Sequence, residues 1–124
     1  MPKPNAKLVR AEKALHAFAL TYPEATEANP WGHLAIKVRS KAFVFMAFDG
    51  ENLSVTAKLP ESHEAALMLP FAEPTGYGLG KSGWVTARFD GGAAVPVDLM
   101  KDWIDESYRK IAPKRLAATL DSKE

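Results

Sequence analysis

The sequence predicts an α+β fold in which a single antiparallel β-sheet of about four or more strands carries helices from both ends of the chain. Two observations support this prediction. The stretch 29–59 holds three short apolar segments separated by two tight breaks, which indicates an antiparallel meander. Helical patterns, with apolar residues three and four positions apart, flank this stretch near both termini. Strands bracketed by helices in this way are typical of α+β domains.

The first helix is predicted over 6–22. Its apolar stripe consists of Leu8, Ala11, Leu15, Phe18 and Tyr22. Asn5 suits the N-cap, and Pro23 ends the helix because the residue before a proline is pushed out of the α region. The following stretch, 24–30, is expected to be a polar connection into the sheet.

Alternation defines the strands of the meander. Apolar and polar residues alternate over 34–39 and again over 53–58, so each segment has one apolar face. The segment 42–48 between them is apolar throughout, as expected of a central strand covered on both faces. Asp49-Gly50 predicts a two-residue turn, because glycine accepts positive φ, and this turn sets Met46 opposite Leu53.

The first hairpin is predicted to have a three-residue loop, 39–41. A two-residue loop would turn the first strand over and bring Lys37 into the core, where an unpaired ammonium is costly. In the predicted register Ala42 and Val44 face the core, whereas Phe43 and Phe45 lie on the outer face of the sheet.

The second half of the chain continues the same fold. A short helix is predicted over 62–69, with Ser62 as its N-cap, and 71–83 is expected to be irregular. A fourth strand is predicted over 84–90, ending in the turn 90–92.

The last long helix is predicted to begin at Pro96, which suits a first helical position. Its apolar stripe consists of Met100, Trp103, Ile104, Ser107, Tyr108 and Ile111. Pro113 breaks this helix or begins a second short one, 114–120.

Length and composition limit the class of protein. A chain of 124 residues is expected to form one domain, 1–124, and it contains no cysteine for disulfides or thiolate metal sites. The N-terminus has no apolar segment typical of a signal peptide, and no apolar run reaches the roughly 18 residues of a membrane span. We therefore expect a cytoplasmic protein that does not enter a membrane. A formal net charge of +1 by itself predicts no partner.

No catalytic signature is present, and the sequence favours a protein that is not an enzyme. The loop 76–82 resembles a phosphate-binding loop, but the motif requires glycine where Thr75 stands, and a strand rather than a helix follows. His16, His33 and His63 are not at metal-binding spacing. We expect no cofactor, no bound metal and no catalytic residue.

The outer face of the predicted sheet interleaves cations with aromatic residues. Cations suit phosphates and aromatic rings stack on bases, so this face is a candidate nucleic-acid interface. The candidate residues on it and on nearby loops are Lys37, Arg39, Lys41, Lys58, Lys81, Trp84 and Arg88. The alternative is that a helix or the glycine-rich segment covers Phe43 and Phe45, and that the lysines only keep the sheet soluble.

Two other functions stay open at this point. A small-ligand or enzyme site is conceivable between 30–33 and 76–83, where Trp31, His33 and Tyr77 would line a pocket. A protein-interaction domain, including a homodimer, is conceivable through an exposed sheet edge or the helix that carries Trp103.

Several short motifs in order resemble the MmcQ/YjbR family. They are Pro30-Trp31-Gly32-His33, Lys37-Val38, Lys41 and Phe43, the run 53–61, Tyr77, the run 81–85 and Ser107-Tyr108. The similarity extends over about 14–120, with Ser40 where members often carry glycine. The resemblance implies a CyaY-like or double-wing α+β domain and suspected DNA binding. The CyaY likeness also suggests iron binding, but the first helix lacks a dense acidic ridge.

Overall fold

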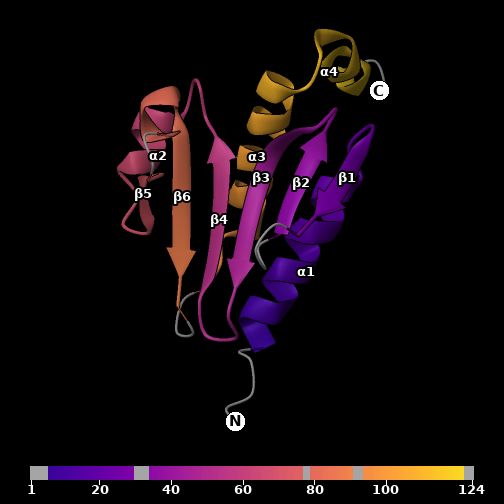
Figure 1. The fold of residues 1–124 in the computed structure, drawn as a ribbon. Coiled ribbons are helices and arrows are strands. Elements are labelled where there is room, and N and C mark those ends of the chain that lie inside the picture. Colours follow the sequence, from indigo (N-terminus) through magenta and orange to yellow (C-terminus); the bar gives the residue numbers. More distant parts are fainter. Residues whose placement is uncertain (1–5, 30–33, 77–78, 91–93, 122–124) are drawn as a thin grey trace.

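The computed structural model describes residues 6–29, 34–76, 79–90 and 94–121. Its centre is a six-stranded antiparallel sheet with the order β1-β2-β3-β4-β6-β5 (Figure 1). The strands are β1 (Ala25–Ala28), β2 (Leu34–Val38), β3 (Lys41–Phe48), β4 (Leu53–Lys58), β5 (Ala72–Pro74) and β6 (Trp84–Phe89). The helices are α1 (Ala6–Leu20), α2 (His63–Leu67), α3 (Val97–Ile111) and α4 (Lys114–Asp121), with a 3₁₀ turn η2 at Leu79–Ser82. The predicted α+β fold is confirmed.

Helices α1 and α3 pack on the same face of the sheet, which we call the inner face (Figure 1). Leu8 and Leu15 of α1 and Met100 and Ile104 of α3 are fully buried there, as their helical spacing predicts. The opposite face, which neither α1 nor α3 covers, is the outer face. None of the described helices is both long enough and apolar enough to cross a membrane.

Two strands were not predicted. Residues 24–30 were expected to be a polar connection, but β1 lies within them and pairs with β2. β5 lies in the segment expected to be irregular and pairs with β6. Both are short strands at the two edges of the sheet, and Thr26, Glu27 and Glu73 are exposed, so neither strand has the alternation that burial of one face imposes.

The first hairpin differs from the prediction in its loop. Val38 pairs with Lys41, so the loop has two residues, Arg39 and Ser40, with φ of 50° and 72°. These positive φ values are those of a type I′ turn, which matches the twist of the strands without glycine. The predicted three-residue loop is therefore wrong.

A β-bulge in β3 restores the facing of β2 that the short loop alone would reverse. Lys37 pairs with Ala42, but the next residue of β2, Ile36, pairs with Val44, leaving Phe43 as the extra residue. Ile36 consequently faces the core and Lys37 the outer face, as predicted.

The bulge reverses the predicted facing of two residues of β3. Phe43 was predicted to lie on the outer face and is instead fully buried, with its ring centroid 5.1 Å from that of Tyr108. Ala42, predicted to face the core, shares the outer face with Lys37.

The second hairpin has a longer loop than predicted. Phe48 pairs with Leu53, so the loop is 49–52 rather than Asp49-Gly50 alone. The Asp49 carboxylate explains the difference, since its Oδ1 accepts hydrogen bonds from the backbone N–H groups of Glu51 (2.9 Å) and Asn52 (2.7 Å). The register moves by two residues. A shift of two leaves each side chain of β4 on its predicted face.

Helix α2 is held by α3 rather than by its own cap. Ser62 is the N-cap residue, as predicted, but its side chain makes no capping hydrogen bond. The backbone N–H groups of Glu61 and Ser62 donate instead to Oε2 of Glu106, each at 3.0 Å. The N-cap predicted for α1, Asn5, and most of the predicted turn 90–92 lie outside the described residues.

Candidate nucleic-acid interface

One end of the sheet gathers most of the candidate residues. At this end β2 and β4 finish and β3 and β6 begin, and it is the upper end in Figure 1. We call it the basic end. The candidates that lie at it are Lys37, Arg39, Lys41, Lys58, Lys81 and Trp84. Arg88 lies apart from them, since it pairs with Ser54 near the opposite end of the sheet.

Lys37 and Lys58 lie on the outer face at the basic end. Lys37 of β2 pairs with Ala42, and Lys58 of β4 pairs with Trp84 of β6. Because β3 separates β2 from β4, their Cα atoms lie two strand spacings apart, roughly 10 Å. Both side chains are half-buried. Their aliphatic stems therefore lie along the sheet while the ammonium groups reach solvent.

The lysines and the arginines of the candidate set differ in their partners. Arg39 forms an ion pair with Glu24, and Arg88 forms one with Glu73. Within the described part of the chain, the side chains of Lys37, Lys41, Lys58 and Lys81 form no ion pair. The lysines thus present charge that the fold leaves available for an anion.

An aromatic residue lies between the two sheet lysines. Phe45 of β3 pairs with Ala35 of β2 and with Thr56 of β4, one step farther along the outer face from Lys37 and Lys58. Its ring is half-buried, with the centroid 5.7 Å from that of Trp84. Trp84 itself is only 8% exposed. Trp84 therefore supports Phe45 from the side and offers little ring surface of its own for stacking.

Hydroxyl groups continue the polar surface toward β5. Oγ1 of Thr86 lies 2.9 Å from Oγ1 of Thr56 and 3.0 Å from Oγ1 of Thr75. The three threonines therefore form one hydrogen-bonded chain across β4 and β6, and it satisfies Thr86, which is buried.

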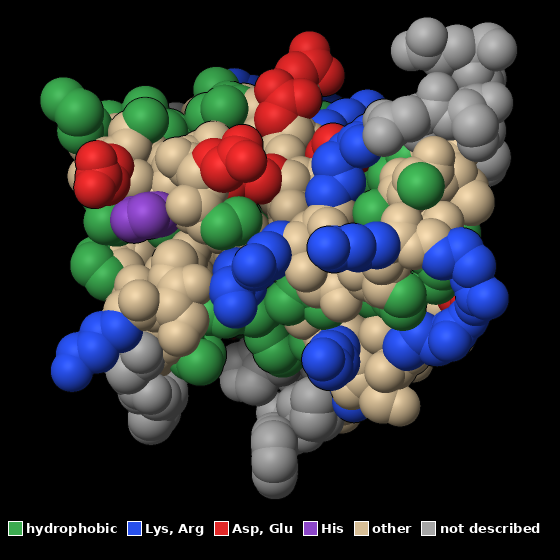
Figure 2. All heavy atoms as spheres, turned by 90° about the horizontal axis from the view of Figure 1, so that it is seen from above, with side chains coloured by type: hydrophobic (Ala, Val, Ile, Leu, Met, Phe, Trp, Pro, Cys, Tyr) green, Lys and Arg blue, Asp and Glu red, His purple; other side chains and the backbone are tan. Residues whose placement is uncertain are grey.

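Sequence reasoning missed the cations that the C-terminal helices add to the basic end. Helix α3 reaches this end at Ser107, and Lys110, Lys114 and Arg115 follow it around Pro113. Figure 2, seen from above Figure 1, shows Lys and Arg side chains across the centre and right of this end, and most visible Asp and Glu side chains toward the upper left. The dense basic run 109–115 was the signal available in the sequence.

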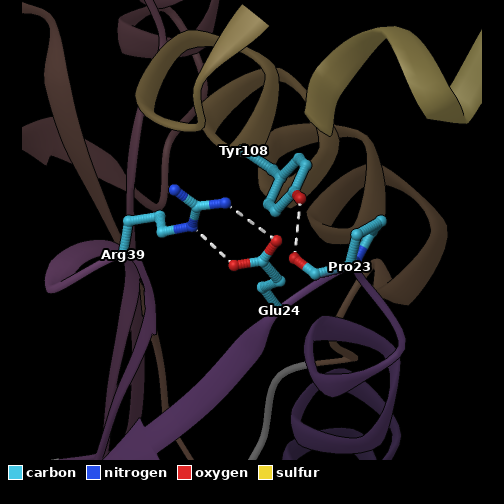
Figure 3. Close-up of polar contacts among 4 residues, drawn as sticks. All are labelled: Pro23, Glu24, Arg39 and Tyr108. Carbon is cyan, nitrogen blue, oxygen red and sulfur yellow. Dashed lines mark hydrogen bonds and ion pairs between the residues drawn. The ribbon is translucent and has the colours of Figure 1, made fainter. Parts of the chain in front are cut away.

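Arg39 is held in a polar cluster that joins three elements (Figure 3). Its Nε donates to Oε1 of Glu24 at 2.5 Å and its Nη2 donates to Oε2 at 3.1 Å. The hydrogen bond and the charge of Arg39 lower the pKa of the Glu24 carboxyl, and Arg115 adds to this effect. Beside the pair, the Tyr108 hydroxyl donates to the carbonyl oxygen of Pro23 at 2.8 Å. The cluster connects the chain before β1, the β2–β3 hairpin and α3.

The opposite end of the sheet has a different character. A shallow hollow of about 500 Å³ lies there, lined by Asp49, Asn52, Ser54 and Arg88 among others.

Over 6–29, 34–76, 79–90 and 94–121, no group of three or more His, Cys, Asp or Glu side chains is placed to hold a metal ion. Trp31, His33 and Tyr77, the residues of the alternative ligand pocket, lie outside the described residues.

Comparison with known proteins finds a family model that matches this chain and a solved structure with a similar fold. A family model described as YjbR matches residues 20–110. The crystal structure of the Deinococcus radiodurans protein DR2400, with the domain named DUF419, resembles this chain with a TM-score of 0.67 and 23% sequence identity. The alignment covers 89% of this chain and 87% of that one. At this level of identity the likeness concerns the fold. Among curated proteins no match was found.

Proposed function

This chain belongs to the YjbR family, and we propose that it binds nucleic acid through the basic end of its sheet. The contact surface is formed by Lys37 and Lys58 on the outer face, together with Lys41 at the start of β3 and Lys81 in η2 before β6. The ligand is a nucleic-acid backbone, whose phosphates pair with the lysine ammonium groups. A fold by itself specifies no activity, and the support for binding comes from the surface of this chain.

The observation that carries the proposal is the uncompensated charge of Lys37 and Lys58 on a face that neither long helix covers. Among the described residues neither side chain forms an ion pair, and the two share one face and one end of the sheet. The fold keeps Lys58 in position through Ser107, whose Oγ accepts a hydrogen bond from the Lys58 backbone N–H at 2.9 Å.

Phe45 supports a ligand with accessible bases. Its half-buried ring lies between the strands of Lys37 and Lys58, so a base that stacks on it has a cation on either side for its flanking phosphates. Double-stranded DNA offers its phosphates but not the faces of its bases. We therefore expect tighter binding to single-stranded than to double-stranded nucleic acid.

Fluorescence anisotropy with labelled single- and double-stranded oligonucleotides tests the proposal. We expect binding at low salt, with log affinity falling linearly against log salt concentration as counterions are released. Changing both lysines, Lys37→Glu with Lys58→Glu, is expected to weaken binding about 10-fold or more and to reduce the salt slope by about 1 to 2.

The matched control is Arg10→Glu with Lys13→Glu, which makes the same charge change at two exposed positions of α1. It is expected to weaken binding no more than about 2-fold, because neither residue is among the cations of the basic end. Absence of binding by the unaltered protein at low salt, or equal losses in the Arg10/Lys13 and Lys37/Lys58 variants, would reject the proposal.

A further inference from the structure

The backbone is forced into an uncommon conformation at one place at the basic end. Among the described residues, those other than glycine with positive φ are Glu24 (60°), Arg39 (50°) and Ser40 (72°). The pairing of Ala25 with Val38 makes Glu24 and Arg39 neighbours across the β1–β2 ladder. Residues other than glycine rarely adopt positive φ, and those that do are concentrated at functional sites.

At this place two N–H groups of the Arg39 guanidinium bind the Glu24 carboxylate. The two oxygens of Glu24 each accept one hydrogen bond from Arg39, at 2.5 Å and 3.1 Å (Figure 3). The same pair of donors matches two oxygens of a phosphate equally well. The charge of Arg115 also acts on the Glu24 carboxylate, so this one anion lies in the field of two guanidinium groups.

The ion pair is open to solvent. The side chains of Arg39 and Glu24 are each 46% exposed, so an incoming anion can reach the guanidinium without unfolding any element. An ion pair this exposed contributes little net stability. The hydrogen bond from Tyr108 to the Pro23 carbonyl does not involve Glu24, so it can hold the backbone in place when the carboxylate moves.

We infer that the Glu24 carboxylate occupies a phosphate-binding position formed by the Arg39 guanidinium, and that a backbone phosphate of the bound nucleic acid displaces it. The inference rests on the proposed function, because the phosphate arrives as part of the same ligand. Lys41, two residues after Arg39, begins β3 at the same end of the sheet. Glu24 thereby limits the affinity of the basic end for polyanions.

The chain offers a matched control for this inference. Arg88 and Glu73 form a second exposed arginine–glutamate pair, near the opposite end of the sheet. Glu24→Gln and Glu73→Gln each remove one negative charge and release one arginine. The two variants therefore differ in position and not in charge.

Oligonucleotide anisotropy over a range of salt concentrations is the first measurement. Glu24→Gln is expected to tighten binding about 3- to 10-fold at low salt and to steepen the salt slope by about 0.7 to 1, the value of one additional phosphate contact. The gain should disappear when Glu24→Gln is made in an Arg39→Gln background. Glu73→Gln is expected to change affinity less than about 2-fold, and thermal unfolding followed by circular dichroism checks that each variant is folded.

Titration with inorganic phosphate, followed by NMR at the Arg39 Nε–H, is the second measurement and needs no nucleic acid. We expect a saturable shift that occurs at lower phosphate concentration in Glu24→Gln than in the unaltered protein. A shift at Arg39 without any oligonucleotide binding would reject the proposed function and retain the anion position. Equal effects of Glu24→Gln and Glu73→Gln, or a gain that persists without Arg39, would overturn the inference while the Lys37/Lys58 result decides the proposed function separately.

Discussion

Ser107 is a small residue that holds the sheet together where its hydrogen-bond ladder is interrupted. It is fully buried on α3, and its hydroxyl donates to the Phe43 carbonyl at 2.5 Å while accepting from the Lys58 N–H at 2.9 Å. These two backbone groups belong to neighbouring strands at the β-bulge. A serine on an apolar helical stripe usually serves packing alone, whereas here it satisfies two buried polar groups.

We predict that Ser107→Ala destabilises the protein by about 2–4 kcal/mol, because both backbone groups lose their partner inside the protein. Urea unfolding followed by circular dichroism measures the change. Ser54→Ala, on the outer face and half-buried, is the control and should cost less than about 1 kcal/mol. A loss for Ser107→Ala as small as that of the control would contradict the role of its hydroxyl.

At the scale of elements, the two hairpins on either side of β3 are built differently. The β3–β4 loop has Gly50 at its positive-φ position (97°), and the Asp49 side chain completes the turn. The β2–β3 loop places Arg39 and Ser40 at positive φ without any glycine. It therefore keeps strain that a more favourable residue would remove.

Ser40→Gly is expected to stabilise the protein by about 0.5–1 kcal/mol, since glycine adopts the φ of 72° without a steric penalty. The midpoint of urea unfolding should rise accordingly. The same change at Ser54, inside β4, should lower it, because glycine weakens a strand interior. Destabilisation by Ser40→Gly would mean that the serine makes a contribution that outweighs the strain.

The elements with strong periodicity were predictable from the sequence, and those set by tertiary contacts were not. The apolar stripes of α1 and α3 and the alternation of β2 and β4 reflect burial against one core, which repeats along each element. The bulge at Phe43 leaves no local signal, because 42–48 is apolar throughout and fits either facing. The edge strands β1 and β5 lack alternation because their exposed side chains are not sorted between two environments.

The candidate site was predictable to the same extent. The facing of Lys37 and Lys58 followed from alternation and is as predicted. The partners of Arg39 and Arg88 could not be predicted, because Glu24 directly precedes β1 and Glu73 lies in β5, and sequence reasoning missed both edge strands. Likewise, the position of Lys110, Lys114 and Arg115 depends on where α3 ends relative to the sheet.

At the scale of the whole molecule, a cluster of aromatic rings joins the segment that follows α1, the sheet and α3. The ring centroid of Tyr22 lies 4.6 Å from that of Tyr108 and 5.9 Å from that of Phe43. The Tyr22 hydroxyl donates to Oδ1 of Asp105 at 2.7 Å, and Arg109 binds the other oxygen of that carboxylate. Burial, followed by the hydrogen bond to Asp105, raises the pKa of Tyr22 well above its ordinary value.

Stability is therefore expected to fall at alkaline pH. The unfolded chain releases the Tyr22 proton near pH 10 while the folded protein retains it, so the contribution is constant below about pH 10 and declines above it by up to about 1.4 kcal/mol per pH unit. Urea unfolding between pH 8 and about 11 measures this slope. In Tyr22→Phe the decline should be shallower, and identical slopes in the two proteins would show that Tyr22 does not contribute.

The bulge at Phe43 makes the chemistry of the outer surface depend on whether the count of residues in one strand is odd or even. Removing a single residue there, with the tight β2–β3 turn kept, would rotate β2 by half a turn and send the Lys37 ammonium toward the helices while Lys58 stayed where it is. When YjbR proteins are aligned, a one-residue gap at this position therefore signals a different surface and not only a different length.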